Sequence, residues 1–195
     1  MRRESSTVVV LVGEVTDGLL TGLSRSANVS VARASAAGPG QHDDRERPAV
    51  RPAWEAGALA LREAARRQST YVIVPDDPLA DVAAEWRAMW DGAGGSARFE
   101  ERAADVLAAW RDKRFELPDY YLVVPGAQPG GADLYLGPLR AVRPRRVAVA
   151  GIADGSSAQQ ASLRDALGSL QHGPWWPPLD EVLDTARRFY AGGLA

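Results

Sequence analysis

Two adjacent aspartates, Asp76 and Asp77, come closest to a chemical site in this sequence. They follow the apolar run at residues 71–74 and precede Pro78. Paired carboxylates at a strand end can hold Mg²⁺ through water and a substrate phosphate. An aspartate before a proline is also a common helix start, with the aspartate as the cap and the proline at the first helical position. We therefore interpret Asp77 as a helix cap and Asp76 as a residue that contacts a ligand.

A loop of small residues at 151–157 is the second candidate site. Its residues Gly155, Ser156 and Ser157 stand where a helix is expected to begin. Backbone amides in that position can bind an anion such as phosphate. The loop matches neither the Gly-x4-Gly-Lys-Ser/Thr pattern of nucleotide-binding loops nor the Gly-x-Gly-x-x-Gly pattern of dinucleotide sites. A plain turn with a serine cap explains the same residues, so both interpretations stay open.

The densest basic cluster contains Arg140, Arg143 and Arg145. A guanidinium group can bind phosphate or carboxylate through two parallel N–H groups, so the cluster predicts a surface for an anion or a partner protein. A solvated turn before a buried strand is the alternative interpretation. Trp175 and Trp176 follow nearby between prolines, and we expect one of them to cover the core and the other to offer a contact surface.

Other reactive side chains are scarce. The chain has no cysteine, which excludes disulfides, thiolate metal sites and a cysteine nucleophile. Of the 23 basic residues only Lys113 is a lysine, and this bias favours a GC-rich, bacterial genome. The histidines, His42 and His172, lie in polar turns without partners at metal-ligand spacing. We predict no catalytic group and no metal ligand, and the sequence identifies no cofactor. The net charge of −2 argues against a nucleic-acid partner.

The strands and helices that position these candidate residues are predicted from the apolar runs of the sequence. The runs at residues 8–12, 71–74, 120–124 and 146–150 predict buried strands, and helical apolar spacing fills most of the chain between them. This alternation predicts a three-layer α/β sandwich with a mainly parallel, Rossmann-like sheet. We expect the first, second and fourth runs to be inner strands, because unbroken apolar runs leave no polar face for water. Residues 133–136 are expected to return as an antiparallel hairpin at the sheet edge.

Ligands of open parallel sheets bind beyond the carboxyl ends of the strands. Gly13, Asp76, Gly126 and the loop at 151–157 all follow predicted strands. The sequence therefore predicts that they lie along one edge and line a common crevice.

The chain is expected to form one domain over residues 1–195, because its length and its 46% content of hydrophobic residues suffice for a continuous core. Residues 34–52 are rich in Gly, Pro, Asp and Arg and predict a mobile surface loop. The run at 8–12 is too short for a secretion signal, and no other stretch approaches a membrane span. We therefore expect a cytoplasmic protein without a membrane partner.

This inventory favours binding over catalysis. Our first hypothesis is a non-catalytic or accessory α/β protein that binds partner proteins and a small anionic, phosphate-bearing ligand at the carboxyl edge of its sheet. The alternative is a Mg²⁺-dependent phosphoryl or phosphodiester transferase or hydrolase that uses Asp76 with Asp77 or Glu14. Convergence of Glu14, Asp76 and a further carboxylate in one concave site would favour the enzyme, whereas an isolated Asp76 beside a capping Asp77 would favour binding.

Overall fold

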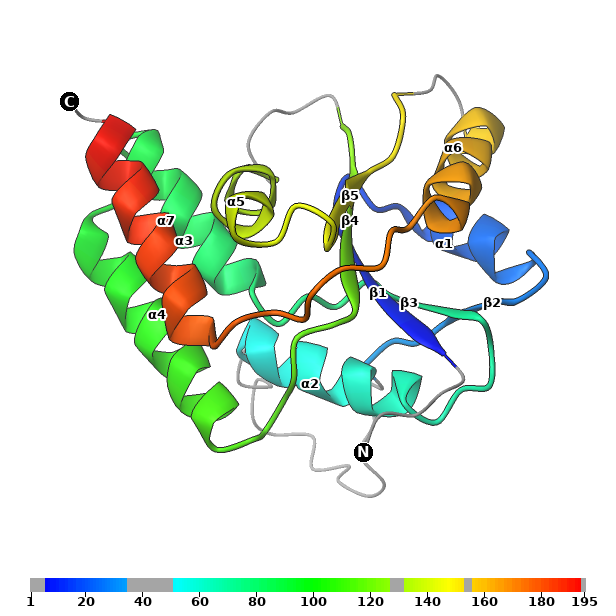
Figure 1. Ribbon diagram of the computed structural model, residues 1–195, viewed down its shortest axis with the longest axis horizontal. Coiled ribbons are helices and arrows are strands. Elements are labelled where there is room, and N and C mark those ends of the chain that lie inside the picture. The colour runs from blue at the N-terminus through cyan, green and yellow to red at the C-terminus, as the bar shows by residue number, and fades with distance from the viewer. Residues whose placement is uncertain (1–5, 35–50, 127–131, 153–155, 194–195) are drawn as a thin grey trace, which may run out of the picture.

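The computed structural model describes residues 6–34, 51–126, 132–152 and 156–193. At its centre is a sheet of five parallel strands in the order β2-β3-β1-β4-β5 (Figure 1). The predicted α/β class with a parallel, Rossmann-like sheet is confirmed. Most of the predicted loop, residues 35–50, lies outside the described residues. The strands are β1 (Thr7–Gly13), β2 (Val29–Val31), β3 (Tyr71–Val74), β4 (Tyr120–Val124) and β5 (Val147–Val149).

Strand β1 lies in the middle of the sheet because both of its faces are apolar. Successive side chains of a strand point to opposite faces, and the neighbours Val9 and Val10 belong to hydrophobic clusters on the two faces. Hydrogen bonds pair β1 with β3 on one side and with β4 on the other. The predicted inner strands at residues 8–12 and 71–74 are thereby confirmed.

The main helices are α1 (Asp17–Ser24), α2 (Ala53–Ala64), α3 (Ala80–Trp90), α4 (Ser96–Arg111), α6 (Ser156–Gly168) and α7 (Leu179–Gly193). The crossover from β1 to β2 runs in one direction along the sheet, and the later crossovers run in the other. Because such crossovers are right-handed, α1 lies on one face and α2, α3 and α4 lie on the opposite face. In Figure 1, α6 accompanies α1 on one side, and α7 lies with α3 and α4 on the other.

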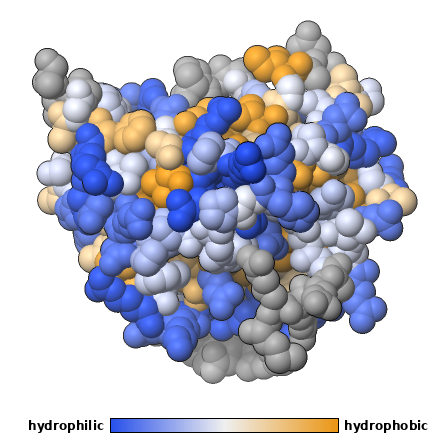
Figure 2. Space-filling model, in the orientation of Figure 1, coloured by the Kyte–Doolittle hydropathy of each residue, from blue (hydrophilic) through white to orange (hydrophobic). Residues whose placement is uncertain are grey.

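Each face of the sheet carries its own hydrophobic cluster. The larger cluster lies under α2, α3, α4 and α7 and includes the aromatic residues Trp86, Phe99, Tyr121 and Trp176. The smaller cluster packs leucines of α1 and α6 against the sheet, namely Leu19, Leu23, Leu163 and Leu167. In the view of Figure 2, hydrophilic residues cover most of the surface and hydrophobic patches lie between them. Within the described ranges no helix is long and apolar enough to cross a membrane.

The predicted antiparallel hairpin at residues 133–136 is wrong. The chain forms a π-helical turn, η1 (Tyr135–Leu139), which continues into α5 (Arg140–Val142). Leu134, Tyr135, Pro138 and Leu139 are buried, and this spacing is helical rather than alternating. The segment therefore packs onto the sheet as a helix, and every strand pair in the described part of the chain is parallel.

The prediction that residues 146–150 form an inner strand is also wrong. Strand β5 is the last strand of the sheet and pairs with β4 alone in the described structure. Val147 is buried, whereas Val149 is 41% exposed. An apolar run can therefore mark an edge strand when helices cover only part of its length.

Candidate functional site

A crevice at the carboxyl ends of β1, β2 and β3 is the candidate site, and we call it the strand-end crevice. It forms because the chain leaves β1 toward α1 on one face and leaves β3 toward α3 on the other, so the two loops diverge. Its volume is about 710 Å³. Its polar lining consists of Asp17, Arg33, Asp76, Asp77, Arg87 and Tyr135. Its apolar walls include Leu11, Val12, Val15, Leu20, Ala80, Ala83 and Ala84.

Gly13 lines this crevice, and its position requires glycine. Its φ is +101°, and a Cβ atom there would lie 2.2 Å from the carbonyl oxygen of Val124. The close approach lets the amide of Glu14 donate a hydrogen bond to the same carbonyl at 3.3 Å. Gly13 therefore ties the end of β1 to the end of β4 at the back of the crevice.

Asp76 joins the ends of two strands. Its Oδ2 accepts a hydrogen bond of 2.7 Å from the backbone amide of Ala34, which follows β2. Its Oδ1 has no hydrogen-bond partner among the described residues. The side chain is half-buried and lines the crevice. One carboxylate oxygen is thus used for structure, and the other is a candidate acceptor for a ligand.

Asp77 is the buried carboxylate of the site, with 8% of its surface exposed. Its Oδ1 accepts a hydrogen bond of 3.0 Å from the amide of Leu79, and its Oδ2 accepts one from the hydroxyl of Tyr135. The prediction that Asp77 caps the helix is wrong, because α3 begins at Ala80 and has Leu79 at its N-cap. The chain makes a turn between Asp77 and the helix, and the aspartate closes that turn instead.

The proton affinity of Asp77 is set by its burial. Desolvation raises the pKa of Asp77 from 3.8 to about 6, against hydrogen bonds from Tyr135 and Leu79 that lower it. The Tyr121 hydroxyl also lies close enough to lower this pKa, although in the described structure no acceptor stands at hydrogen-bonding geometry to that hydroxyl. Burial raises the pKa of both tyrosines well above 10. The site thus joins one weakly acidic carboxyl group to two neutral phenols.

The arginines of the crevice are already paired with carboxylates. Arg33 meets Asp17 at 2.6 Å, and both side chains are exposed. Arg87 on α3 contacts Asp91 at 2.8 Å and Asp133 at 2.5 Å. The positive charge of both arginines is therefore at least partly neutralised by carboxylates of the protein.

The described residues of the predicted loop of small residues do not line this crevice. Gly155 falls outside the described residues, Ser156 begins α6, and Ser157 is exposed. The carbonyl of Gly151 accepts a hydrogen bond of 3.0 Å from the hydroxyl of Ser162. Anion binding by this loop stays a prediction.

The predicted arginine cluster is also separate from the crevice. Arg143 donates a hydrogen bond of 2.6 Å to the carbonyl of Trp175, and Arg145 donates a longer one of 3.4 Å to that of His172. Arg140 is exposed at the end of η1. Two of the three guanidinium groups thus contact the connection between α6 and α7, and a role in ligand or partner binding stays a prediction.

Arg146 takes a structural role that sequence reasoning missed. It is 6% exposed and donates hydrogen bonds to the carbonyls of Asp119, Gly173 and Pro174 at 2.7 to 3.1 Å. Its guanidinium also lies over the ring of Trp175, 4.9 Å from the centroid. Trp175 is 38% exposed and Trp176 is 6% exposed, which confirms that one tryptophan faces the core and the other faces outward.

The carboxylates do not form a metal centre among the described residues. No group of three or more Asp, Glu, His or Cys side chains there is arranged to hold a metal ion. The convergence of Glu14, Asp76 and another carboxylate that would favour the enzyme hypothesis is therefore not found in that part of the chain.

Sequence reasoning placed Gly13 and Asp76 in a common crevice, and the structure brings them together there. It missed Arg33, Arg87 and Tyr135. Arg33 could have been found, because residues 28–33 alternate as in a strand and Arg33 lies at its carboxyl end. Tyr135 was missed because its segment was predicted to form a strand of a hairpin.

Three comparisons with known proteins gave no match to a family model, to a curated protein or to a solved structure.

Proposed function

We propose that this protein is a non-catalytic α/β binding protein that holds a small molecule in the strand-end crevice. One observation carries the proposal: the ends of three parallel strands enclose about 710 Å³ with apolar walls and carboxylate acceptors. Small-molecule sites commonly have about 300 to 1,000 Å³ and combine apolar walls with a few polar groups. The position also follows the general rule for ligands of open parallel sheets.

The lining favours a ligand that brings hydrogen-bond donors. Asp76 offers Oδ1, and Asp77 lies beside it with a carboxylate that accepts bonds at both oxygens. An anionic ligand, as expected from the sequence, would have to compete with the carboxylates that already pair with Arg33 and Arg87. We therefore propose an uncharged or cationic ligand, such as a polyol or an amine, for this crevice.

Partner proteins remain part of the proposal. Several large apolar side chains are exposed on the described surface, with Ile152 at 89% and Trp175 and Phe189 at about 40%. Contiguous apolar patches mark contact sites on soluble proteins, so a partner surface would require some of these side chains to lie together. We place this activity in the cytoplasm, on the basis of the sequence. The Mg²⁺-dependent alternative would need a further ligand beside Asp76, and no observation favours it.

A thermal-shift screen of amines, polyols and phosphate esters tests the proposal. Ala84→Leu adds side-chain volume at the crevice wall, so we expect it to abolish the stabilisation that a hit gives to the wild type. Ala104→Leu, on an exposed position of α4, is the matched control and should keep the response. Equal responses from both variants would contradict binding in the crevice. A shift given by Mg²⁺ alone and lost in Asp76→Asn would favour the enzyme.

A further inference from the structure

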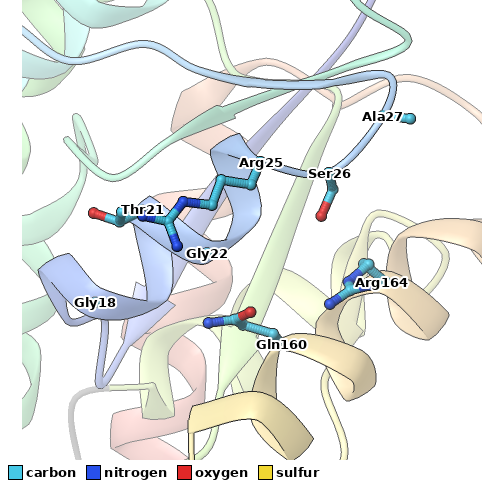
Figure 3. A pocket seen from close by; sticks show the side chains of 8 residues that line it. All are labelled: Gly18, Thr21, Gly22, Arg25, Ser26, Ala27, Gln160 and Arg164. Carbon is cyan, nitrogen blue, oxygen red and sulfur yellow. The ribbon is translucent and has the colours of Figure 1, made fainter.

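A second hollow lies between α1 and α6, on the face of the sheet opposite to α3, and we call it the α1/α6 hollow. Its volume of about 670 Å³ would also suit a small molecule. The polar side chains that line it are Thr21, Arg25, Ser26, Gln160 and Arg164. In Figure 3, Gln160 and Arg164 reach from α6 toward α1, and Arg25 turns back along α1 toward Thr21.

All five of these side chains can donate hydrogen bonds. None of them makes a side-chain hydrogen bond or an ion pair with another described residue, and no carboxylate lines the hollow. The strand-end crevice differs, because carboxylates supply much of its polar lining. A hollow that is lined by hydrogen-bond donors and has no negatively charged side chain complements an anion with several oxygen atoms.

Arg25 and Arg164 have no acidic partner among the described residues, a property that they share with other exposed arginines such as Arg62 and Arg140. Elsewhere Arg33 pairs with Asp17, Arg67 with Glu63 and Arg187 with Glu100. The position of Arg25 after the last turn of α1 suggests a different explanation, since helix carbonyls attract cations there. Its guanidinium, however, makes no hydrogen bond to those carbonyls in the described structure.

Gly22 makes the hollow possible. A Cβ atom at this position would lie 1.9 Å from Nε2 of Gln160 and 2.1 Å from Cδ. Any larger residue would push the Gln160 amide away from α1. The glycine therefore lets this amide lie between the two arginines as a third donor group.

We propose that the α1/α6 hollow binds the phosphate group of a small phosphate monoester. Arg25 and Arg164 contact the phosphate from the two helices, each able to offer two parallel N–H groups, and Gln160 adds a neutral donor. The hydroxyls of Thr21 and Ser26 bind the remaining oxygens or the organic part. This site is separate from the strand-end crevice and does not depend on the function proposed for it.

Isothermal titration calorimetry with inorganic phosphate, glycerol 3-phosphate and glycerol tests this site. We expect both phosphates to bind, the ester more tightly, and glycerol to give no heat. Arg25→Gln and Arg164→Gln should each weaken phosphate binding at least tenfold. Arg62→Gln is the control, because Arg62 is exposed on α2, across the sheet, and makes no ion pair with a described residue.

Four outcomes would overturn the proposal. Absence of heat with both phosphates would show that the hollow binds no phosphate. Equal weakening of phosphate binding by Arg62→Gln would show that the arginine variants act only through the net charge of the protein. Loss of binding in Ala84→Leu, with the arginine variants unaffected, moves the anion to the strand-end crevice. Equal affinity for inorganic phosphate and glycerol 3-phosphate would show that the hollow recognises the free ion and would contradict a phosphate monoester as its ligand.

Thr21→Glu gives a test that keeps both arginines. It adds a carboxylate at an exposed helical position beside the hollow, so we expect it to abolish phosphate binding while the melting temperature stays within a few degrees. Unchanged phosphate affinity in this variant would contradict the proposed site.

Discussion

At the scale of single residues, two opposing effects determine the pKa of Asp77. Burial favours its neutral form, whereas the amide of Leu79 and the hydroxyl of Tyr135 stabilise its charge. The local sequence predicted a helix that begins directly after Asp77, whereas the structure has a turn there and the helix begins at Ala80. The contact with Tyr135 could not be predicted, because that residue lies 58 positions away in a segment whose helical form was not recognised.

The raised pKa of Asp77 predicts a pH-dependent contribution to stability. Between pH 3.8 and about 6 the folded state keeps a proton on this carboxyl that the unfolded state has lost. The fold therefore loses stability as the pH rises through this window, by about 3 kcal/mol in total, since one pKa unit corresponds to about 1.4 kcal/mol.

Asp77→Asn removes this titration and preserves the shape of the side chain. In urea unfolding from pH 4 to 7.5, we expect the free energy of unfolding of the wild type to fall relative to the variant as the pH rises. Other carboxyl groups titrate equally in both proteins and cancel in the difference. Parallel pH profiles for the two proteins would contradict the raised pKa.

The two tyrosines near Asp77 should respond differently to loss of their hydroxyl groups. Tyr135→Phe removes a hydrogen bond to a buried carboxylate, so we expect the free energy of unfolding to fall by about 1.5 to 3 kcal/mol at pH 7, and less at pH 4. The Tyr121 hydroxyl also lowers the pKa of Asp77 but has no hydrogen-bond partner among the described residues, so Tyr121→Phe should cost less, about 0.5 to 1 kcal/mol. Chemical denaturation of both variants checks this, and a larger loss in Tyr121→Phe would reverse the assignment.

At the scale of elements, helix packing depends on two glycines with different neighbours. A Cβ atom at Gly57 of α2 would lie 2.5 Å from the backbone nitrogen of Pro78, which the turn before α3 holds in place. A Cβ atom at Gly22 of α1 would meet only the far end of the Gln160 side chain, which can rotate away. The same substitution should therefore have opposite effects at the two positions.

We expect Gly57→Ala to lower the free energy of unfolding by about 1 to 3 kcal/mol, because the added methyl group overpacks a rigid contact. Gly22→Ala should leave stability unchanged or raise it by up to about 1 kcal/mol, because alanine is the better helix former. Thermal melts of the two variants against the wild type measure both effects. Losses of similar size at both positions would show that Gln160 cannot move.

The sequence predicted the elements with long, regular patterns and missed those whose form depends on their neighbours. Strands β1 and β3 followed from their apolar runs, and α3 and α4 followed from helical spacing. The edge position of β5 could not be predicted, because the run at residues 146–150 has the same composition as an inner strand. The segment at 133–136 is too short for its spacing to separate a strand from a helix.

At the scale of the whole molecule, only part of the strand-end crevice could be predicted from the sequence. Gly13 and Asp76 were expected there because the carboxyl ends of parallel strands meet at one edge of a sheet. Arg87 comes from the body of α3 and Tyr135 from η1, and only the packing of these helices on the sheet brings them to the crevice. Side chains from helix interiors carry no local signal of such a role.

The connection between α6 and α7 is fixed to the sheet by Arg146. This guanidinium binds three backbone carbonyls, on Asp119, Gly173 and Pro174, and lies between the rings of Tyr120 and Trp175. The connection leads to α7, which packs against α4 and η1 on the opposite layer. Arg146 therefore helps to hold the two helical layers together across the edge of the sheet.

Arg146→Leu should lower the free energy of unfolding by about 3 kcal/mol, because it leaves partly buried carbonyls without their charged donor. Arg145→Leu is the matched control: Arg145 is the exposed neighbour with one long hydrogen bond, so its loss should cost less than about 0.5 kcal/mol. Urea denaturation gives both values. Limited proteolysis should cleave Arg146→Leu within residues 171–178 faster than the wild type, because the connection has lost its anchor. Equal stability and equal cleavage of the two variants would show that packing of Trp176 alone holds the connection.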